Sequence, residues 1–337
     1  AISTGFCRPD AWWAGYDVYM SFVAILVALL IEQARPLTSG NLVHNNVRVW
    51  VRWTARNFDA GQQSHGWLAW SFAVLIPSAV TLAVHCALVA TMGWPAAVIW
   101  NVIVLYATLG FRQFSHHFTA IRDALEEEDE ELARTLLARW QQIDAKDLPQ
   151  SEIVRQVIEQ SVLAAHRHVF GVLAWYSVLA AFGLGPAGAV LYRLSEFVAR
   201  YWKHHSHSLR QPVSAALQTV SVSAWQAIDW LPARITAFGF AIVGSFEDTI
   251  DNWRNVDQGR GSDNDGIILA ATAGAMNLNL KAVFVGDPPR RMERRSAARV
   301  GQTPELAHLR TIVGLVWRSV VMWMLLLALL TLARLLG

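Results

Sequence analysis

An acidic and a basic residue, Asp229 and Arg234, stand five positions apart beside the apolar stretch 237–246. Ionisable side chains at the edge of hydrocarbon are costly unless they are paired or face a polar cavity. Five positions on one helix correspond to about 140° of rotation, so the two side chains would not face each other. We expect Pro232 to break that helix and to place Arg234 in the first turn of the next one. Two interpretations stay open: a structural pair (or an arginine that sets the depth of a span), and an anchor for an anionic ligand or partner.

Histidine groups and an acidic loop are the candidates for metal binding. His204 and His207 have the spacing of two ligands on a helix, but they lie at a predicted membrane edge, where hydrated histidines are commoner than ligands. The polar loop 252–266 resembles a calcium loop only in composition, because Ile268 stands where the twelfth-position glutamate is needed. The sequence contains no phosphate-binding or dinucleotide-binding glycine motif. We therefore predict no metal site from the residues themselves.

The composition indicates a membrane protein. The 337 residues are 54% hydrophobic and only 16% charged, whereas soluble domains carry about 25% charged residues. The 16 tryptophans fit the same class, since tryptophan favours the headgroup boundary. We predict an all-α, polytopic helical membrane protein of about five or six spans with amphipathic cytoplasmic helices, a lipid bilayer as its partner, and no nucleic acid.

Apolar runs place the candidate spans, each of which needs about 20 apolar residues. They lie at about 18–31, 67–91, 96–111, 169–191, 231–246 and 311–336. Lys and Arg gather in the loops after the first span, between the third and fourth spans, and before the last span. Those loops are expected in the cytoplasm, with both termini outside. An interfacial or re-entrant helix at 211–227 would change the count, and whether 192–230 crosses the membrane is left open.

The domain organisation follows from these spans. Residues 1–19 read as an N-terminal extension without a signal peptide, and 20–336 as one membrane domain. Its expected cytoplasmic parts are a helical insertion and a long loop. The insertion (112–168) contains an amphipathic helix at 114–142 and a second helix at 151–165, and the loop (247–310) contains a turn at 263–266 before a helix at 267–280.

Two segments carry a resemblance to a known family. Phe182-Gly-Leu-Gly-Pro-Ala-Gly-Ala-Val-Leu-Tyr-Arg193 and Asp229-Trp-Leu-Pro-Ala-Arg-Ile-Thr-Ala237 resemble the CobD/CbiB family of integral membrane proteins, including its AmpE-like branch. The order of the remaining segments fits from about residue 20 to 335. The resemblance implies a structural motif of five residues: Gly185, Pro186, Gly188, Trp230 and Pro232.

The resemblance also implies a function. It points to a multi-pass protein of the bacterial cytoplasmic (inner) membrane in cobalamin biosynthesis. The family's enzymes join an aminopropanol unit, or its phosphate, to the carboxylate of adenosylcobyric acid with ATP and Mg²⁺, which requires groups that hold metal and phosphate charge. The positions kept from the family pattern are the expected ligand-binding residues: Asp229, Arg234, Glu159, Asn264, Asp265 and Gly266.

The chain departs from the enzymes' pattern at several carboxylates. Their Glu-Asn…Asp-Gly reads Leu163-Ala164…Arg167-His168, and their Asn-Thr-x-Asp reads Glu196-Phe-Val-Ala199. Losing such groups costs orders of magnitude in rate. We therefore predict a diverged regulatory or scaffold member, similar to AmpE, a proposed membrane sensor linked to cell-wall and β-lactam response. The alternative is an ATP- and Mg²⁺-dependent adenosylcobinamide(-phosphate) synthase, and only then are those cofactors expected. Whether the ligand is a corrinoid or a cell-wall-related molecule, and whether the chain self-associates, is left open. No catalytic residues are predicted.

Overall fold

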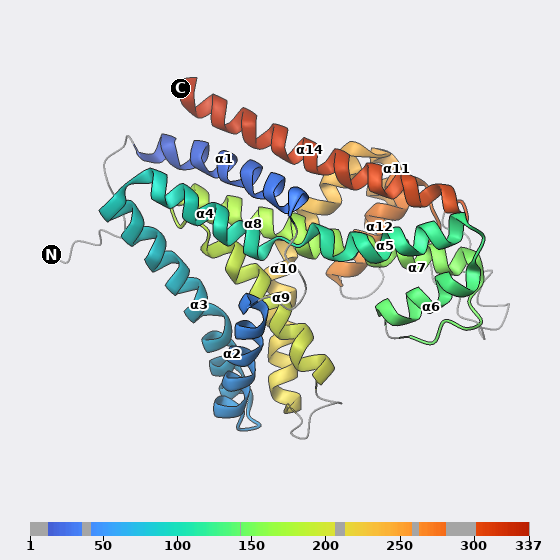
Figure 1. Ribbon diagram of the computed structural model, residues 1–337, viewed down its shortest axis with the longest axis horizontal. Coiled ribbons are helices and arrows are strands. Elements are labelled where there is room, and N and C mark those ends of the chain that lie inside the picture. Colours follow the sequence, from blue (N-terminus) through green and yellow to red (C-terminus); the bar gives the residue numbers. More distant parts are fainter. Residues whose placement is uncertain are drawn as a thin grey trace. The chain divides into compact units, whose positions relative to one another are not determined.

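The computed structural model describes residues 13–35, 42–141, 143–205, 213–257, 263–280 and 301–336 (Figure 1). These residues form helices joined by turns, with no strand among them, so the all-α prediction is confirmed. Much of the N-terminal extension, His207 and parts of the loop 247–310 lie outside the described residues. The helices are α1 (Trp13–Ala34), α2 (Leu42–Phe58), α3 (Gln63–Met92), α4 (Trp94–Thr108), α5 (Phe111–Glu126), α6 (Glu130–Gln141), α7 (Gln150–Ala165), the π-helix η1 (His166–Phe170), α8 (Gly171–Ala181), α9 (Ala187–His205), α10 (Ala215–Val243), α11 (Phe246–Asp257), α12 (Asn264–Met276) and α14 (Leu306–Leu336).

The described residues divide into two compact units. Residues within 1–113, 167–232 and 324–337 form unit 1, and those within 114–166 and 233–323 form unit 2. In unit 1, α3 packs against α2, α4 and α9, while α8 packs against α1 and α9. One core of this unit joins α2, α3, α9 and α10 through buried side chains that include Val51, Trp70, Val198, Trp202 and Leu217.

Unit 2 is built around the pairing of α11 with α12, which lie side by side in Figure 1. The two backbones come very close at Gly274, where an added Cβ would lie 2.4 Å from the Cα of Thr249. α12 also packs against α7, and α7 against α6. The small residues of α12 thus serve close helix packing.

Three helical runs in the described part are long and apolar enough to cross a membrane: Gln63–Met92, Gln150–Ala181 and Leu306–Ala333. Shorter apolar helices lie at Ser21–Ala34 and Trp94–Thr108. The second run joins two segments that the sequence analysis treated separately, a helix at 151–165 and a span at 169–191, into one continuous helical run. The helical run ends earlier because Gly183 and Gly185 take positive φ angles of 74° and 54°, which favour glycine.

Other predicted helices differ at their ends. The amphipathic segment 114–142 is two helices, α5 and α6, because the chain turns at Glu128 with φ 61°. The segment predicted to start at 267 begins at Asn264 and ends at Met276, where Asn277 takes the left-handed conformation (φ 53°). Asn264 and its neighbour Asp265 therefore belong to the first turn of α12 and not to a preceding turn.

The prediction that Pro232 breaks the chain is wrong, because Pro232 lies inside the continuous helix α10. A proline removes the N–H that would bond the carbonyl four residues earlier, which here is Ile228. The indole N–H of Trp175 donates to that carbonyl at 2.9 Å. The same replacement occurs at Pro77 in α3, where the indole of Trp50 donates to Ala73 O at 3.3 Å.

The Trp175 hydrogen bond leads to a test. Trp175→Phe keeps an aromatic ring but leaves the Ile228 carbonyl without its donor. We expect the free energy of unfolding to fall by about 1–3 kcal/mol, the cost of an unsatisfied buried polar group. Thermal unfolding of the purified protein in detergent measures this change. The matched control is Trp94→Phe, whose indole is 49% exposed; equal stability of the two variants would contradict the assigned role.

Candidate functional site

A buried tyrosine–carboxylate pair lies at the centre of unit 1. Tyr192 of α9 donates its hydroxyl to Asp229 Oδ1 of α10 at 2.8 Å, and both side chains are fully buried. The tyrosine ring lies directly on the backbone of Gly171, where an added Cβ would come within 2.0 Å of Tyr192 Cζ. Glycine at this position therefore admits the ring that holds Asp229.

The π-helix η1 precedes Gly171 and places Arg167 and His168 on this side of the chain. A π-helical turn is uncommon and often marks a functional site. His168 is 8% exposed, and its Nδ1 has no hydrogen-bond partner among the described residues. Arg167 lies close enough to Tyr192 and Glu196 to affect both electrostatically. η1 thus brings the Arg167 guanidinium near Tyr192.

Glu196 of α9 is the centre of a buried ion-pair network. Its side chain is 2% exposed, with Arg193 Nη1 at 2.6 Å and Arg200 Nε at 2.8 Å. Burial alone raises the pKa of the Glu196 carboxyl, but Arg200, Arg193 and Arg167 outweigh it, so the pKa lies below its ordinary value. Glu196 is therefore ionised and held on both sides by guanidinium groups.

His44 of α2 closes the network. Burial lowers the pKa of its imidazole, and Arg48, Arg193 and Arg200 lower it further. The imidazole is therefore kept neutral at neutral pH. With His44 neutral, Arg167, Arg193 and Arg200 all act on the single Glu196 carboxylate, so positive charges outnumber the negative charge around it. The arrangement suits an anion.

The same donor set does not fit Mg²⁺, the metal that the sequence resemblance brought into question. Mg²⁺ requires oxygen ligands in near-octahedral geometry. The network offers the Glu196 carboxylate, already bound by two guanidiniums, and the Asp229 carboxylate, already bound by Tyr192. No group of three His, Cys, Asp or Glu side chains gathers as metal ligands among the described residues.

The other predicted ligand residues lie in unit 2 and are only partly brought together. Arg234 Nη1 donates to Asn264 Oδ1 at 3.4 Å, although 30 positions separate them. Asp265 and Gly266 follow Asn264 in the first turn of α12. Glu159 instead pairs with Arg155 on its own helix and, within the described residues, with none of the other predicted ligands. Ligand binding at these positions stays a prediction.

The predicted structural motif lies at the corner between α8 and α9. An added Cβ at Gly185 would lie 2.6 Å from the ring of His85, and one at Gly188 would lie 2.2 Å from the Trp175 carbonyl oxygen. Pro186 is buried directly before α9. Trp230 is 52% exposed on α10, so it lies on the outer surface of that helix.

The sequence matches one protein family over most of its length. The family description "CobD/Cbib protein" matches residues 22–316. The chain belongs to the CobD/CbiB family. A Cobalamin biosynthesis protein CobD of Stutzerimonas stutzeri (strain A1501) is 27% identical over 315 residues, covering 91% of this chain and 96% of that protein. A protein of the same name from Chromobacterium violaceum is 29% identical over 228 residues, covering 67% of this chain and 69% of its own length. No solved structure matches.

Within this CobD/CbiB chain, sequence reasoning missed three residues of the network. The sequence does indicate ion pairs for Glu196, because Arg193 and Arg200 stand three and four positions away on one helix. Tyr192, the partner of Asp229, lies 37 positions from it and gave no local signal. His44 lies on another helix altogether, and only the folded chain brings it to Glu196.

Proposed function

We propose that this chain is a diverged regulatory or scaffold member of the CobD/CbiB family, a multi-pass protein of the bacterial cytoplasmic membrane that does not perform the synthase reaction. Three helical runs long and apolar enough to cross a membrane support the membrane placement. The observation that carries the functional part is the charge of the Glu196 network. On the enzyme pattern that the resemblance implies, Arg167 stands at an aspartate position and Glu196 at an asparagine position.

The two replacements act together. Arg167 stabilises the ionised form of Glu196, so a position that is acidic in the enzymes has become basic, and a neutral one has become acidic. A carboxylate arrangement suited to metal-bound phosphate is thereby turned into a buried ion-pair network in which arginines predominate. Such a network favours structure or anion recognition over carboxylate activation, which needs a metal to stabilise charge.

Further positions support the same proposal. Leu163, Ala164 and Ala199 stand where the enzymes' pattern has Glu, Asn and Asp. An apolar side chain cannot replace an acid as a metal ligand or proton acceptor. A corrinoid or a cell-wall-derived molecule is the ligand class that a sensor of this family would bind.

The second candidate is an adenosylcobinamide(-phosphate) synthase that uses ATP and Mg²⁺. It is favoured by the Stutzerimonas relative, named a cobalamin biosynthesis protein, which this chain matches over 96% of that protein. It is also favoured by the Arg234–Asn264 contact, which keeps two family positions together.

Turnover separates the two candidates. The purified full-length protein is incubated with adenosylcobyric acid, aminopropanol phosphate and Mg-ATP, and the amide product is sought by mass spectrometry. The Stutzerimonas relative is run under the same conditions, and cooperative thermal unfolding establishes that the preparation is folded. We expect no product from this chain. Amide formation would reject the regulatory proposal and establish the synthase.

The same preparation tests binding. A ligand that binds only the folded state raises its stability by RT ln(1 + [L]/Kd). We expect thermal stabilisation by a corrinoid or a cell-wall fragment that does not depend on Mg²⁺. Stabilisation that requires both Mg²⁺ and ATP would instead support the synthase.

A further inference from the structure

Helix α2 presents a cationic outer face. Arg48, Arg52 and Arg56 follow one another at four-residue steps, which places them in one row along the helix. All three are exposed. Val49 (63% exposed) and Trp53 (47% exposed) run beside this row. The helix contains no acidic residue, so nothing on α2 itself neutralises the row.

The opposite face of α2 is fixed to a candidate membrane helix. Val51 is fully buried in the core shared with α3, and Trp50 donates to the Ala73 carbonyl of α3. Phe58 stacks on Phe72 with ring centroids 4.6 Å apart. α2 and the first part of α3 run side by side in Figure 1. α2 is therefore fixed beside a helix that is long and apolar enough to cross a bilayer.

The arginines are available for a partner. Arg48 and Arg56 make no hydrogen bond or ion pair within the described residues, while Arg52 donates to Tyr201 Oη at 3.4 Å. A guanidinium binds phosphate through two parallel N–H groups. Trp53, stacked on Trp50 at 5.3 Å, supplies the amphipathic aromatic group typical of the headgroup boundary. Exposed valine and tryptophan beside three arginines complement a membrane surface, which offers both apolar lipid chains and anionic headgroups. A soluble anion would contact only the arginines.

We propose that the outer face of α2 binds the headgroups of anionic phospholipids and thereby fixes unit 1 against the bilayer. The site is independent of the proposed function, since none of its three arginines belongs to the predicted ligand residues. An electrostatic contact of this kind weakens as salt screens it, whereas the apolar insertion of α3 does not. Salt sensitivity therefore distinguishes headgroup binding by α2 from the general solvation of the spans by lipid.

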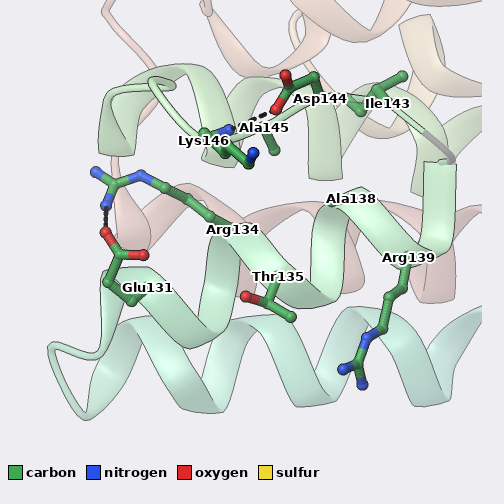
Figure 2. Close-up of a pocket in the computed structure, with 9 residues that line it drawn as sticks. All are labelled: Glu131, Arg134, Thr135, Ala138, Arg139, Ile143, Asp144, Ala145 and Lys146. Carbon is green, nitrogen blue, oxygen red and sulfur yellow. Dashed lines mark hydrogen bonds and ion pairs between the residues drawn. The ribbon is translucent and has the colours of Figure 1, made fainter.

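A second group of cations offers a matched control. In unit 2, a surface cavity of about 520 Å³ between α6 and the segment after it is lined in part by Arg134, Arg139 and Lys146 (Figure 2). Arg134 is turned to Glu131, while Arg139 points away from both other cations. These charges do not converge on one partner. Removing Arg139 and Lys146 changes the net charge by the same amount as removing two arginines from α2.

The test compares Arg48→Gln/Arg56→Gln with Arg139→Gln/Lys146→Gln in the full-length protein. Short-chain phosphatidylglycerol is titrated into each detergent-solubilised variant, and bound lipid is measured by native mass spectrometry. We expect the α2 variant to bind about 25-fold more weakly than the unmodified protein, at about fivefold per arginine, and the control variant to be unchanged. The lost binding should be the salt-sensitive part. Because Arg48 and Arg56 make no hydrogen bond or ion pair in the described chain, both variants should unfold at the same temperature as the parent.

Four outcomes would overturn the proposal. An equal loss in the two variants would show that only net charge matters. Equal binding of zwitterionic phosphatidylcholine would remove the headgroup charge as the determinant. Displacement of the lipid by inorganic phosphate alone would identify a free-anion site, and binding of an acidic peptide in preference to lipid vesicles would identify a protein partner.

Discussion

Replacing Glu196 by glutamine is expected to lower the free energy of unfolding by about 3–5 kcal/mol, the cost of breaking a buried ion pair. The carboxylate is 2% exposed and neutralises Arg193, whose side chain is itself only 16% exposed. Glutamine keeps the shape but removes the charge, so Arg193 would remain buried without a counter-charge. Chemical unfolding in detergent, followed by circular dichroism, measures the loss.

The matched control for this prediction is Glu127→Gln, an exposed glutamate on the turn after α5. We expect this change to stay within about 0.5 kcal/mol, as for other surface substitutions. Adding Arg193→Met to Glu196→Gln should restore part of the stability, because the uncompensated charge is then removed. If Glu196→Gln were as stable as Glu127→Gln, the network would not contribute to folding.

The pH dependence gives an independent check on the same pair. The pKa of Glu196 in the folded protein lies below its value in the unfolded chain, which is about 4.3. The unfolded state therefore takes up the proton first, and the stability due to Glu196 is present above about pH 4.3. It is lost as the pH falls through the lower, folded pKa. The gap between the parent and Glu196→Gln should narrow over that acidic range.

The sequence predicted the helical class and most apolar helices because those depend on local composition and periodicity. It failed at Pro232, where local propensity favours a break. The missing donor is supplied by Trp175, 53 positions away from Ile228. A contact of that separation leaves no trace in the local pattern, so the continuity of α10 could not be foreseen.

The candidate site likewise combines features that local sequence predicts with features that depend on distant contacts. The spacing of Arg193, Glu196 and Arg200 on one helix is readable from the sequence, and it predicts ion pairs. Their burial is not readable, because it depends on α2 and η1 approaching from elsewhere in the chain. Asp229 was singled out for its cost beside hydrocarbon, and the structure gives it Tyr192 as a hydrogen-bond donor. The partner came from α9, which no local rule connects to Asp229.

Replacing Gly188 by alanine is expected to destabilise unit 1 by about 3 kcal/mol or more, at the upper end of overpacking effects. The new Cβ would lie 2.2 Å from the carbonyl oxygen of Trp175 and 2.7 Å from its carbonyl carbon. These are backbone atoms of α8, which cannot rotate away as a flexible side chain could. Thermal unfolding in detergent gives the size of the loss, and Gly314→Ala is the control.

Gly314 lies within α14 and an added Cβ there meets no atom within 4 Å. Its replacement should leave stability unchanged or raise it slightly, since alanine favours a helix over glycine. If both variants behaved alike, the close approach of α8 and α9 at Gly188 would be in doubt. Only the glycine at the crowded corner should be sensitive.

The corner at Gly188 also bears on the proline in α10. The carbonyl of Trp175 faces Gly188, while its indole donates to Ile228. A methyl group at 188 that pushes Trp175 aside should therefore also strain the hydrogen bond that compensates for Pro232. Gly188→Ala and Trp175→Phe should then be non-additive, with the double variant less destabilised than the sum of the two. Strict additivity would mean that the backbone and the indole of Trp175 respond independently. The two segments that carry the family resemblance, 182–193 and 229–237, would then not be coupled through this residue.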